Sequence, residues 1–148
     1  MHHPSILSTR RRRQRGQAMV ESALVLIVSL GVLMGTCDFG QFLYLHQSLT
    51  ERVRMAARYG AVKPYTWPGT DTQNIAVYNT AAPAEGAKAV VPGLTTSMVT
   101  AEIIAEGTDA ARIRVSITNY PFNFFSPWIA KQATARPIIA SIPYEYGP

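Results

Sequence analysis

The sequence of 148 residues is poor in the side chains that most often build catalytic or metal sites. Its one cysteine, Cys37, excludes an internal disulfide framework and a multi-cysteine metal cluster. Two of the three histidines are His2 and His3, and no histidine follows residue 60. The acids beyond residue 60 also lack the spacing of a catalytic motif. We therefore predict no metal, no cofactor and no enzymatic activity.

Acidic residues are absent from the first twenty positions, where basic residues gather instead. Five of the fourteen basic residues are Arg10 to Arg13 and Arg15. The nine that remain equal the nine acids in number, so the rest of the chain is formally neutral. Phosphate binding needs surplus cations on the folded body, so we expect no nucleic-acid partner.

Charge is missing again over the sixteen residues from Ser22 to Cys37. Counted from Gln17, the apolar stretch is 21 residues long and is interrupted only by Glu21. At ~1.5 Å per residue it spans roughly 30 Å, the thickness of a bilayer's hydrocarbon core. We predict that residues 17–37 cross a membrane and that the basic leader, residues 1–16, stays in the cytoplasm. A small-x-small cleavage pattern does not follow the stretch, which disfavours a cleaved secretory signal.

The helical pattern continues beyond this span as an amphipathic, extracytoplasmic segment over residues 38–60. Its apolar residues recur every three to four positions, and no proline occurs before Pro64. We predict one helix from about Gln17 to about Tyr59. Within it, Asp38 is expected to cap the span at the outer interface, Gly40 to allow close packing or a bend, and Cys37 to be a small buried residue.

The remaining residues predict a linker with a short helix (61–93) and a small antiparallel sheet (94–148). Asp71 is expected to cap the short helix over Thr72–Tyr78. A half-buried strand is indicated by alternation, because Ile113, Val115 and Ile117 are separated by polar side chains. Thr96–Ala105 is its expected partner, and Thr134–Tyr146 is expected at an edge because it contains Pro137 and Pro143. The predicted fold class is α+β, with the sheet packed on the outer half of the long helix.

A connection between the second and third predicted strands is unusually aromatic. Two interpretations stay open for it: the segment completes a small core, or it forms a contact surface for a neighbouring subunit or the membrane. The candidate contact residues are Tyr120, Phe122, Phe124, Phe125 and Trp128.

The junction between the arginines and the apolar span carries the most specific motif. It reads Arg15-Gly16-Gln17-Ala18-Met19-Val20-Glu21, a glycine followed at the fifth position by a carboxylate. This resembles the processing site of type IV prepilins, whose peptidase cuts after the glycine. The longer string through Asp38-Phe39-Gly40 and Ala56-Ala57-Arg58-Tyr59 resembles the TadE-like family, pseudopilins of the tight-adherence (Flp, type IVb) pilus system. The resemblance implies a processing site at Gly16 and Gln17.

The position of Glu21 in the sequence also indicates a role for its carboxylate, independently of the resemblance. A carboxylate at the start of an apolar helix is costly unless it is paired, although the helix dipole favours it there. Cleavage after Gly16 would create an amine on Gln17, four residues before Glu21 and on the same face. Glu21 would then pair with its own amine or with that of a neighbouring subunit. The resemblance implies the second, with Glu21 setting the register of assembly.

Two functional classes follow. The first is a processed pseudopilin or minor pilin of the bacterial inner membrane, with a prepilin peptidase, other pilin subunits, an inner-membrane assembly platform and the bilayer as partners. The second is an uncleaved bitopic membrane protein whose outer domain binds or hydrolyses a ligand. An amino terminus at Gln17 supports the first class, and one at Met1 supports the second.

Overall fold

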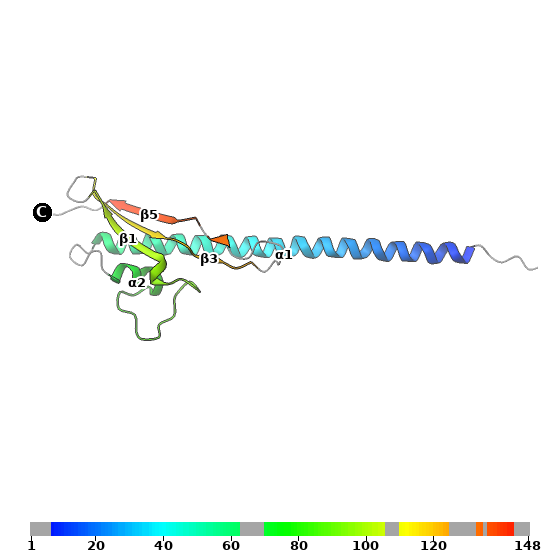
Figure 1. Ribbon diagram of the computed structural model, residues 1–148, viewed down its shortest axis with the longest axis horizontal. Helices are drawn as coiled ribbons and strands as arrows, with labels where there is room; N and C mark the ends of the chain where they lie inside the picture. The colour runs from blue at the N-terminus through cyan, green and yellow to red at the C-terminus, as the bar shows by residue number, and fades with distance from the viewer. Residues whose placement is uncertain (1–6, 63–69, 106–109, 125–132, 135, 144–148) are drawn as a thin grey trace, which may run out of the picture. The chain divides into compact units, whose positions relative to one another are not determined.

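The computed structural model describes residues 7–62, 70–105, 110–124, 133–134 and 136–143, and the side chains among them except those of 7–15, 133 and 134 (Figure 1). A long N-terminal helix, a short helix and a three-stranded antiparallel sheet confirm the predicted α+β class. The chain divides into two compact units, Met1–Phe39 and Gly40–Pro148.

Helix α1 extends from Leu7 to Val62 without interruption. It begins ten residues before the predicted start at Gln17, because the arginines and glutamine of the leader are themselves good helix formers. It ends two residues before Pro64, as expected from the restriction that proline places on the preceding backbone. The close packing expected at Gly40 is not found among the described residues, since a Cβ added there would have no contact within 4 Å.

The C-terminal half of α1 supplies one wall of the core of the unit Gly40–Pro148. Four of its side chains are 0% exposed and lie in one cluster with the inward face of the sheet: Leu49, Val53, Ala56 and Ala57. Leu49, Val53 and the neighbouring pair Ala56 and Ala57 follow one another at three to four residues, which places them on one face of the helix. This packing confirms the prediction that the sheet covers the outer part of the long helix.

Helix α2, Thr70–Tyr78, confirms the predicted short helix but starts two residues earlier. Asp71 therefore lies within the first helical turn and is not the cap. Asn79 ends the helix in a left-handed conformation with φ of 62°, which asparagine tolerates better than most residues. Arg52 of α1 donates a hydrogen bond to the Asn79 side chain at 3.1 Å and ties the two helices together.

The main sheet has the order β1-β2-β5, and both of its pairings are antiparallel. Strand β2, Arg112–Ile117, confirms the alternating pattern, because Ile113, Val115 and Ile117 are at most 1% exposed. Strand β1, Val99–Ile104, is shorter than predicted because Thr96–Met98 form a 3-10 turn. Strand β5, Ile138–Pro143, lies at an edge as its prolines predicted.

A second, two-stranded sheet was not predicted. It pairs β3, Pro121–Phe122, with β4, Ala133–Thr134. Two residues are too few to give an alternating pattern, so such a ladder leaves no periodic signal in the sequence. The tetrapeptide Glu106–Asp109, predicted to be a turn between β1 and β2, lies outside the described residues.

Candidate functional site

Gly16 and Gln17 lie within helix α1 and are both exposed. A Cβ added at Gly16 would meet no atom within 4 Å, so no described residue covers the bond between the two. Glycine lowers the stability of a helix interior by about 1 kcal/mol relative to alanine. The backbone at Gly16 is therefore both accessible and easier to open than its neighbours.

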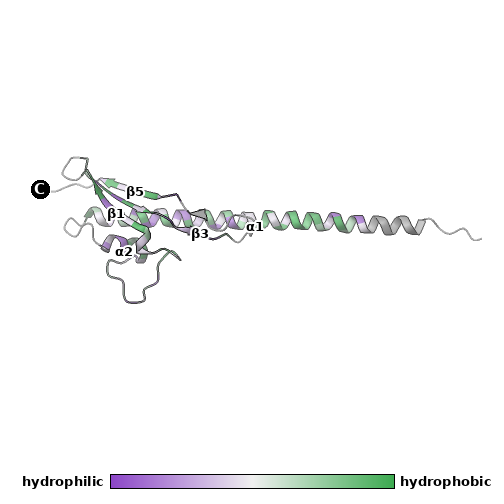
Figure 2. Ribbon diagram, viewed as in Figure 1, coloured by the Kyte–Doolittle hydropathy of each residue, from purple (hydrophilic) through white to green (hydrophobic). Residues whose placement is uncertain are grey.

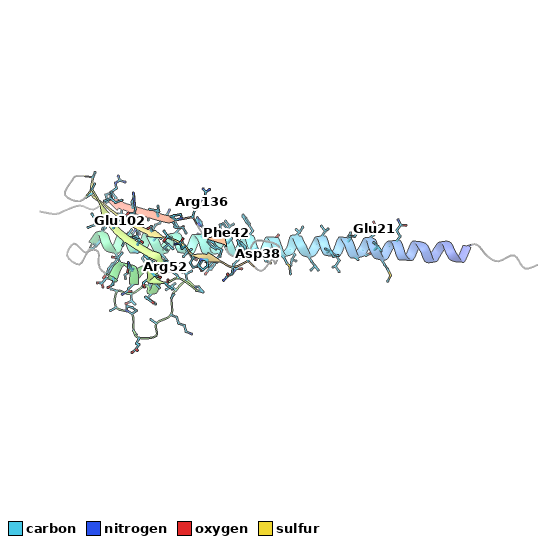
Figure 3. The ribbon with its side chains drawn as sticks, in the orientation of Figure 1. Glu21, Asp38, Phe42, Arg52, Glu102 and Arg136 are labelled. Carbon is cyan, nitrogen blue, oxygen red and sulfur yellow. The ribbon has the colours of Figure 1, made fainter. Side chains whose placement is uncertain are left out.

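Glu21 follows one turn later and is exposed on the same helix (Figure 3). Gln17 and Glu21 are four residues apart, which places them on one helical face. Among the residues whose side chains are described, no ion pair involves Glu21; the ion pair found joins Arg114 to Glu102 at 3.3 Å.

The residues after Glu21 form an apolar surface on every side of the helix (Figure 2). The stretch is long and apolar enough to cross a membrane, and none of its most apolar window is buried within the chain. Two of its hydroxyl groups are satisfied within the helix: Ser22 donates to the Ala18 carbonyl and Thr36 to the Val32 carbonyl, both at 2.9 Å. Such bonds within the helix let serine and threonine face lipid without an unpaired donor.

The end of the apolar stretch differs from expectation at two residues. Cys37 is exposed and not buried as predicted. Asp38 is only 2% exposed, so its carboxylate does not cap the span from the outer interface, and it has an interaction partner within the structure.

The structure places part of the aromatic segment in the core, and the rest of the segment lies outside the described residues. Tyr120 and Phe122 are 3% and 2% exposed and belong to the core, with their rings 5.3 Å apart at 74°. Phe42 of α1 lies 4.9 Å from Phe122, measured between ring centroids (Figure 3). Phe124 is half-buried beside this cluster. The other two candidate contact residues, Phe125 and Trp128, lie outside the described residues, and a contact role for them stays a prediction.

The Tyr120 hydroxyl is the one strongly held polar group of this cluster. It donates a hydrogen bond of 2.7 Å to the carbonyl of Pro92. Burial raises the pKa of the Tyr120 phenol above its ordinary value, because the charged phenolate is poorly solvated there. These features stabilise the fold and indicate no catalytic role.

Histidine, cysteine and carboxylate side chains do not gather into a metal-binding group anywhere among the described residues. The features that distinguish this chain are therefore the Gly16–Glu21 junction and the exposed apolar helix that follows it.

The comparison with protein families agrees with this location. Residues 16–58 match the model of the family described as TadE-like protein. This part of helix α1 is similar to the TadE-like family. The match begins at Gly16, includes the whole apolar stretch and ends in the part of α1 that contributes to the core. No curated protein and no solved structure matches the chain.

The match also assigns a broad class. The TadE-like family is a family of pilus components and not of enzymes. Together with a single N-terminal helix able to cross a membrane, it fits a membrane-anchored, pilus-associated protein.

Proposed function

We propose that this protein is a pseudopilin or minor pilin that a prepilin peptidase cuts between Gly16 and Gln17. It would take part in assembling a tight-adherence (Flp, type IVb) pilus or a related secretion apparatus. The observation that carries the proposal is the glycine five residues before a carboxylate, at the start of an uncharged helix whose apolar surface is uncovered.

The proposed organisation follows from the charge and hydropathy of α1. Residues 1–16 are a cytoplasmic leader that is removed, residues 17–37 cross the inner membrane, and residues 38–60 continue outside it. The linker (61–93) and the sheet region (94–148) would then lie in the periplasm. Five arginines before the span support this direction, since basic residues are retained on the cytoplasmic side.

Glu21 is proposed to receive the amine that cleavage creates. A carboxylate inside the hydrocarbon region is expensive unless it is paired, and the nearest described partner would be the new ammonium group of Gln17. The same pairing can be made with the ammonium of an adjacent subunit, which would fix the position of one helix against another. The partners required are a prepilin peptidase, other pilin subunits and an inner-membrane platform.

The peptide bond after Gly16 is helical in the intact chain, so cleavage requires the helix to open locally. Glycine reduces the free energy of that opening, and it also leaves the amino-terminal side of the scissile bond without a side chain. A Gly16→Ala variant keeps the helix and adds a methyl group at this bond. We expect it to accumulate as the longer precursor in cells that process the wild type.

Amino-terminal sequencing of the mature protein, produced in cells that contain a prepilin peptidase, tests the proposal directly. A start at Gln17 is expected. Gly31→Ala provides a matched control, because Gly31 lies in the same helix and also has no neighbour within 4 Å of an added Cβ. An amino terminus at Met1, or equal processing of the Gly16→Ala variant, would instead indicate an uncleaved bitopic membrane protein with an outer binding or enzymatic domain.

A further inference from the structure

The exposed apolar surface of helix α1 does not end with the predicted span at Cys37. Large apolar side chains remain exposed at Phe39 (62%), Leu43 (48%) and Tyr44 (71%). After Tyr44, the next exposed large apolar residue of α1 is Met55. The surface of the helix therefore changes from apolar to mixed after Tyr44, about two turns beyond Cys37.

Exposed carboxylates are absent from the same part of α1. Between Glu21 and Glu51 the sequence has one acidic residue, Asp38. Its side chain is only 2% exposed and has an interaction partner within the structure. Anionic lipid headgroups would therefore meet no exposed negative charge on α1 before Glu51, and electrostatic repulsion would not keep them away.

The C-terminal unit is also apolar at this level of the helix. Phe42 lies 4.9 Å from Phe122 between ring centroids, so strand β3 packs beside the turn of α1 that contains Leu43 and Tyr44. Arg136 is exposed and lies at the same end of the unit as Phe42 (Figure 3). This end combines apolar side chains with a cation, which suits the boundary between lipid tails and anionic headgroups.

Bilayer dimensions are compatible with a contact at this depth. Each headgroup layer adds roughly 5–8 Å to the hydrocarbon core, or about four helical residues. With residues 17–37 in the core, the outer layer ends near Gln41. A displacement of α1 by about one turn toward the cytoplasm brings Leu43 and Tyr44 into that layer. The same displacement moves Glu21 toward the cytoplasmic surface, where its charge costs less.

We propose that Leu43, Tyr44 and Arg136 rest on the headgroups of anionic phospholipids in the outer leaflet, and we call these three residues the headgroup contact. Tyr44 supplies an amphipathic ring, Leu43 an apolar side chain, and Arg136 a guanidinium group for the phosphate. Because the membrane surface runs across the helix axis, the three side chains need a common depth and not a common face of α1. The inference rests on the membrane-crossing part of the proposed function and not on cleavage after Gly16.

Spin labels on the full-length chain measure this depth. The chain carries Cys37→Ser and is labelled at Tyr44→Cys in phosphatidylcholine vesicles with and without phosphatidylglycerol. Collisions of the label with oxygen report lipid, and collisions with a water-soluble nickel chelate report water. We expect the oxygen-to-nickel ratio at Tyr44→Cys to be several-fold higher than at Glu51→Cys. Glu51 is a matched control because it is exposed on the same side of α1, ~10.5 Å farther along the helix.

A reference label and the two reagents separate the possible surroundings of Tyr44. Leu33 is 61% exposed within the apolar stretch, so Leu33→Cys should report lipid in any chain that crosses the membrane. A second copy or another protein covering Tyr44 would lower the collisions with both reagents. Lipid lowers the collisions with nickel and raises those with oxygen.

Anionic lipid tests the contribution of Arg136. Phosphatidylglycerol should raise the ratio of lipid-exposed to water-exposed label at Tyr44→Cys roughly fivefold, the effect of one arginine near an anionic surface. Arg136→Gln should abolish this increase. Arg112→Gln should retain it, because Arg112 is exposed in the same sheet but pairs with Pro143, at the end of β5 far from Arg136.

Each outcome has a distinct meaning. A label at Tyr44→Cys as water-exposed as that at Glu51→Cys, while Leu33→Cys reports lipid, would overturn the headgroup contact and leave the proposed function standing. Lowered collisions with both reagents would also overturn it, as would a response to phosphatidylglycerol that persists in Arg136→Gln or is lost in Arg112→Gln. The proposed function fails separately, through a water-exposed Leu33→Cys label or an amino terminus at Met1.

Discussion

Tyr120 illustrates how a small core uses an aromatic residue with a polar tip. Its ring is buried against Phe122, while its hydroxyl reaches the carbonyl of Pro92 in the long connection between α2 and β1. The connection is fixed at other points as well, since Val90 donates to the Val77 carbonyl at 2.9 Å and Asn74 donates to the Ala81 carbonyl at 2.9 Å. One hydroxyl thus links the aromatic cluster to the part of this connection that precedes the 3-10 turn Thr96–Met98.

Removing that hydroxyl should destabilise the protein. We expect Tyr120→Phe to lower the free energy of unfolding by about 1 kcal/mol, since the hydrogen bond is lost and the Pro92 carbonyl loses its partner. Chemical unfolding of the full-length protein in detergent measures the change. Tyr44→Phe is the matched control, because Tyr44 is 71% exposed and should change stability by a few tenths of a kcal/mol at most. Equal effects at the two positions would show that the bond to Pro92 contributes nothing.

The same phenol predicts a pH dependence at the alkaline end. Burial raises the pKa of Tyr120 in the folded state, so the unfolded chain loses this proton at a lower pH than the folded chain does. The folded state then binds more protons, and stability falls as the pH rises above about 10. Below that pH the contribution is complete and constant.

This decline should be smaller in Tyr120→Phe than in the wild type when unfolding is compared between pH 8 and pH 11, a range chosen around the ordinary tyrosine pKa of about 10. Parallel curves for the two proteins would contradict the assignment.

Single residues also mark where sequence reasoning reached its limit. The spacing of Gly16 and Glu21 is local, so it could be recognised in the sequence and agrees with where the TadE-like match begins. Asp38 was expected at the outer interface, but its side chain is only 2% exposed, which its place at the end of the uncharged stretch did not indicate.

At the level of elements, strand β2 was predictable because every second residue is apolar and ends at most 1% exposed. The start of α1 and the β3–β4 ladder were not. The basic leader has high helix propensity but no apolar face to indicate where a helix begins, and the ladder depends on pairing between residues about twelve positions apart. Propensity and periodicity identify elements that bury a whole face, but they do not identify short pairings.

The two faces of the sheet predict different costs for one substitution. Ile113→Val in β2 should lower the free energy of unfolding by about 1 kcal/mol, because Ile113 is 0% exposed and a methylene is removed from the core. Ile139→Val in β5 removes the same group from a side chain that is 57% exposed, and it should be nearly neutral. Thermal or chemical unfolding of both variants measures the difference. A neutral Ile113→Val would mean that this side of the sheet is not the tightly packed one.

At the scale of the whole molecule, the charge distribution and the apolar stretch of α1 both bear on how the chain would insert into a membrane. A stretch with a fully exposed apolar surface is stable only in lipid, and the direction in which it inserts is set by the basic residues beside it. Five arginines precede the span, whereas Arg52 and Arg54 are the first basic residues after it. In the proposed organisation, this balance would retain the leader in the cytoplasm and place the C-terminal unit across the membrane.

Replacing Arg10 to Arg13 and Arg15 by glutamine should remove this bias, so that a substantial fraction of molecules inserts with the C-terminal unit in the cytoplasm. Protease accessibility of that unit in spheroplasts measures the fraction: in the wild type it should be digested from outside, and in the variant partly protected. The control replaces Arg112 and Arg114 by glutamine. These exposed residues of β2 lie more than seventy positions beyond the span, so the orientation should not change. An unchanged orientation in the five-glutamine variant would show that the outer unit, and not the leader, determines the direction of insertion.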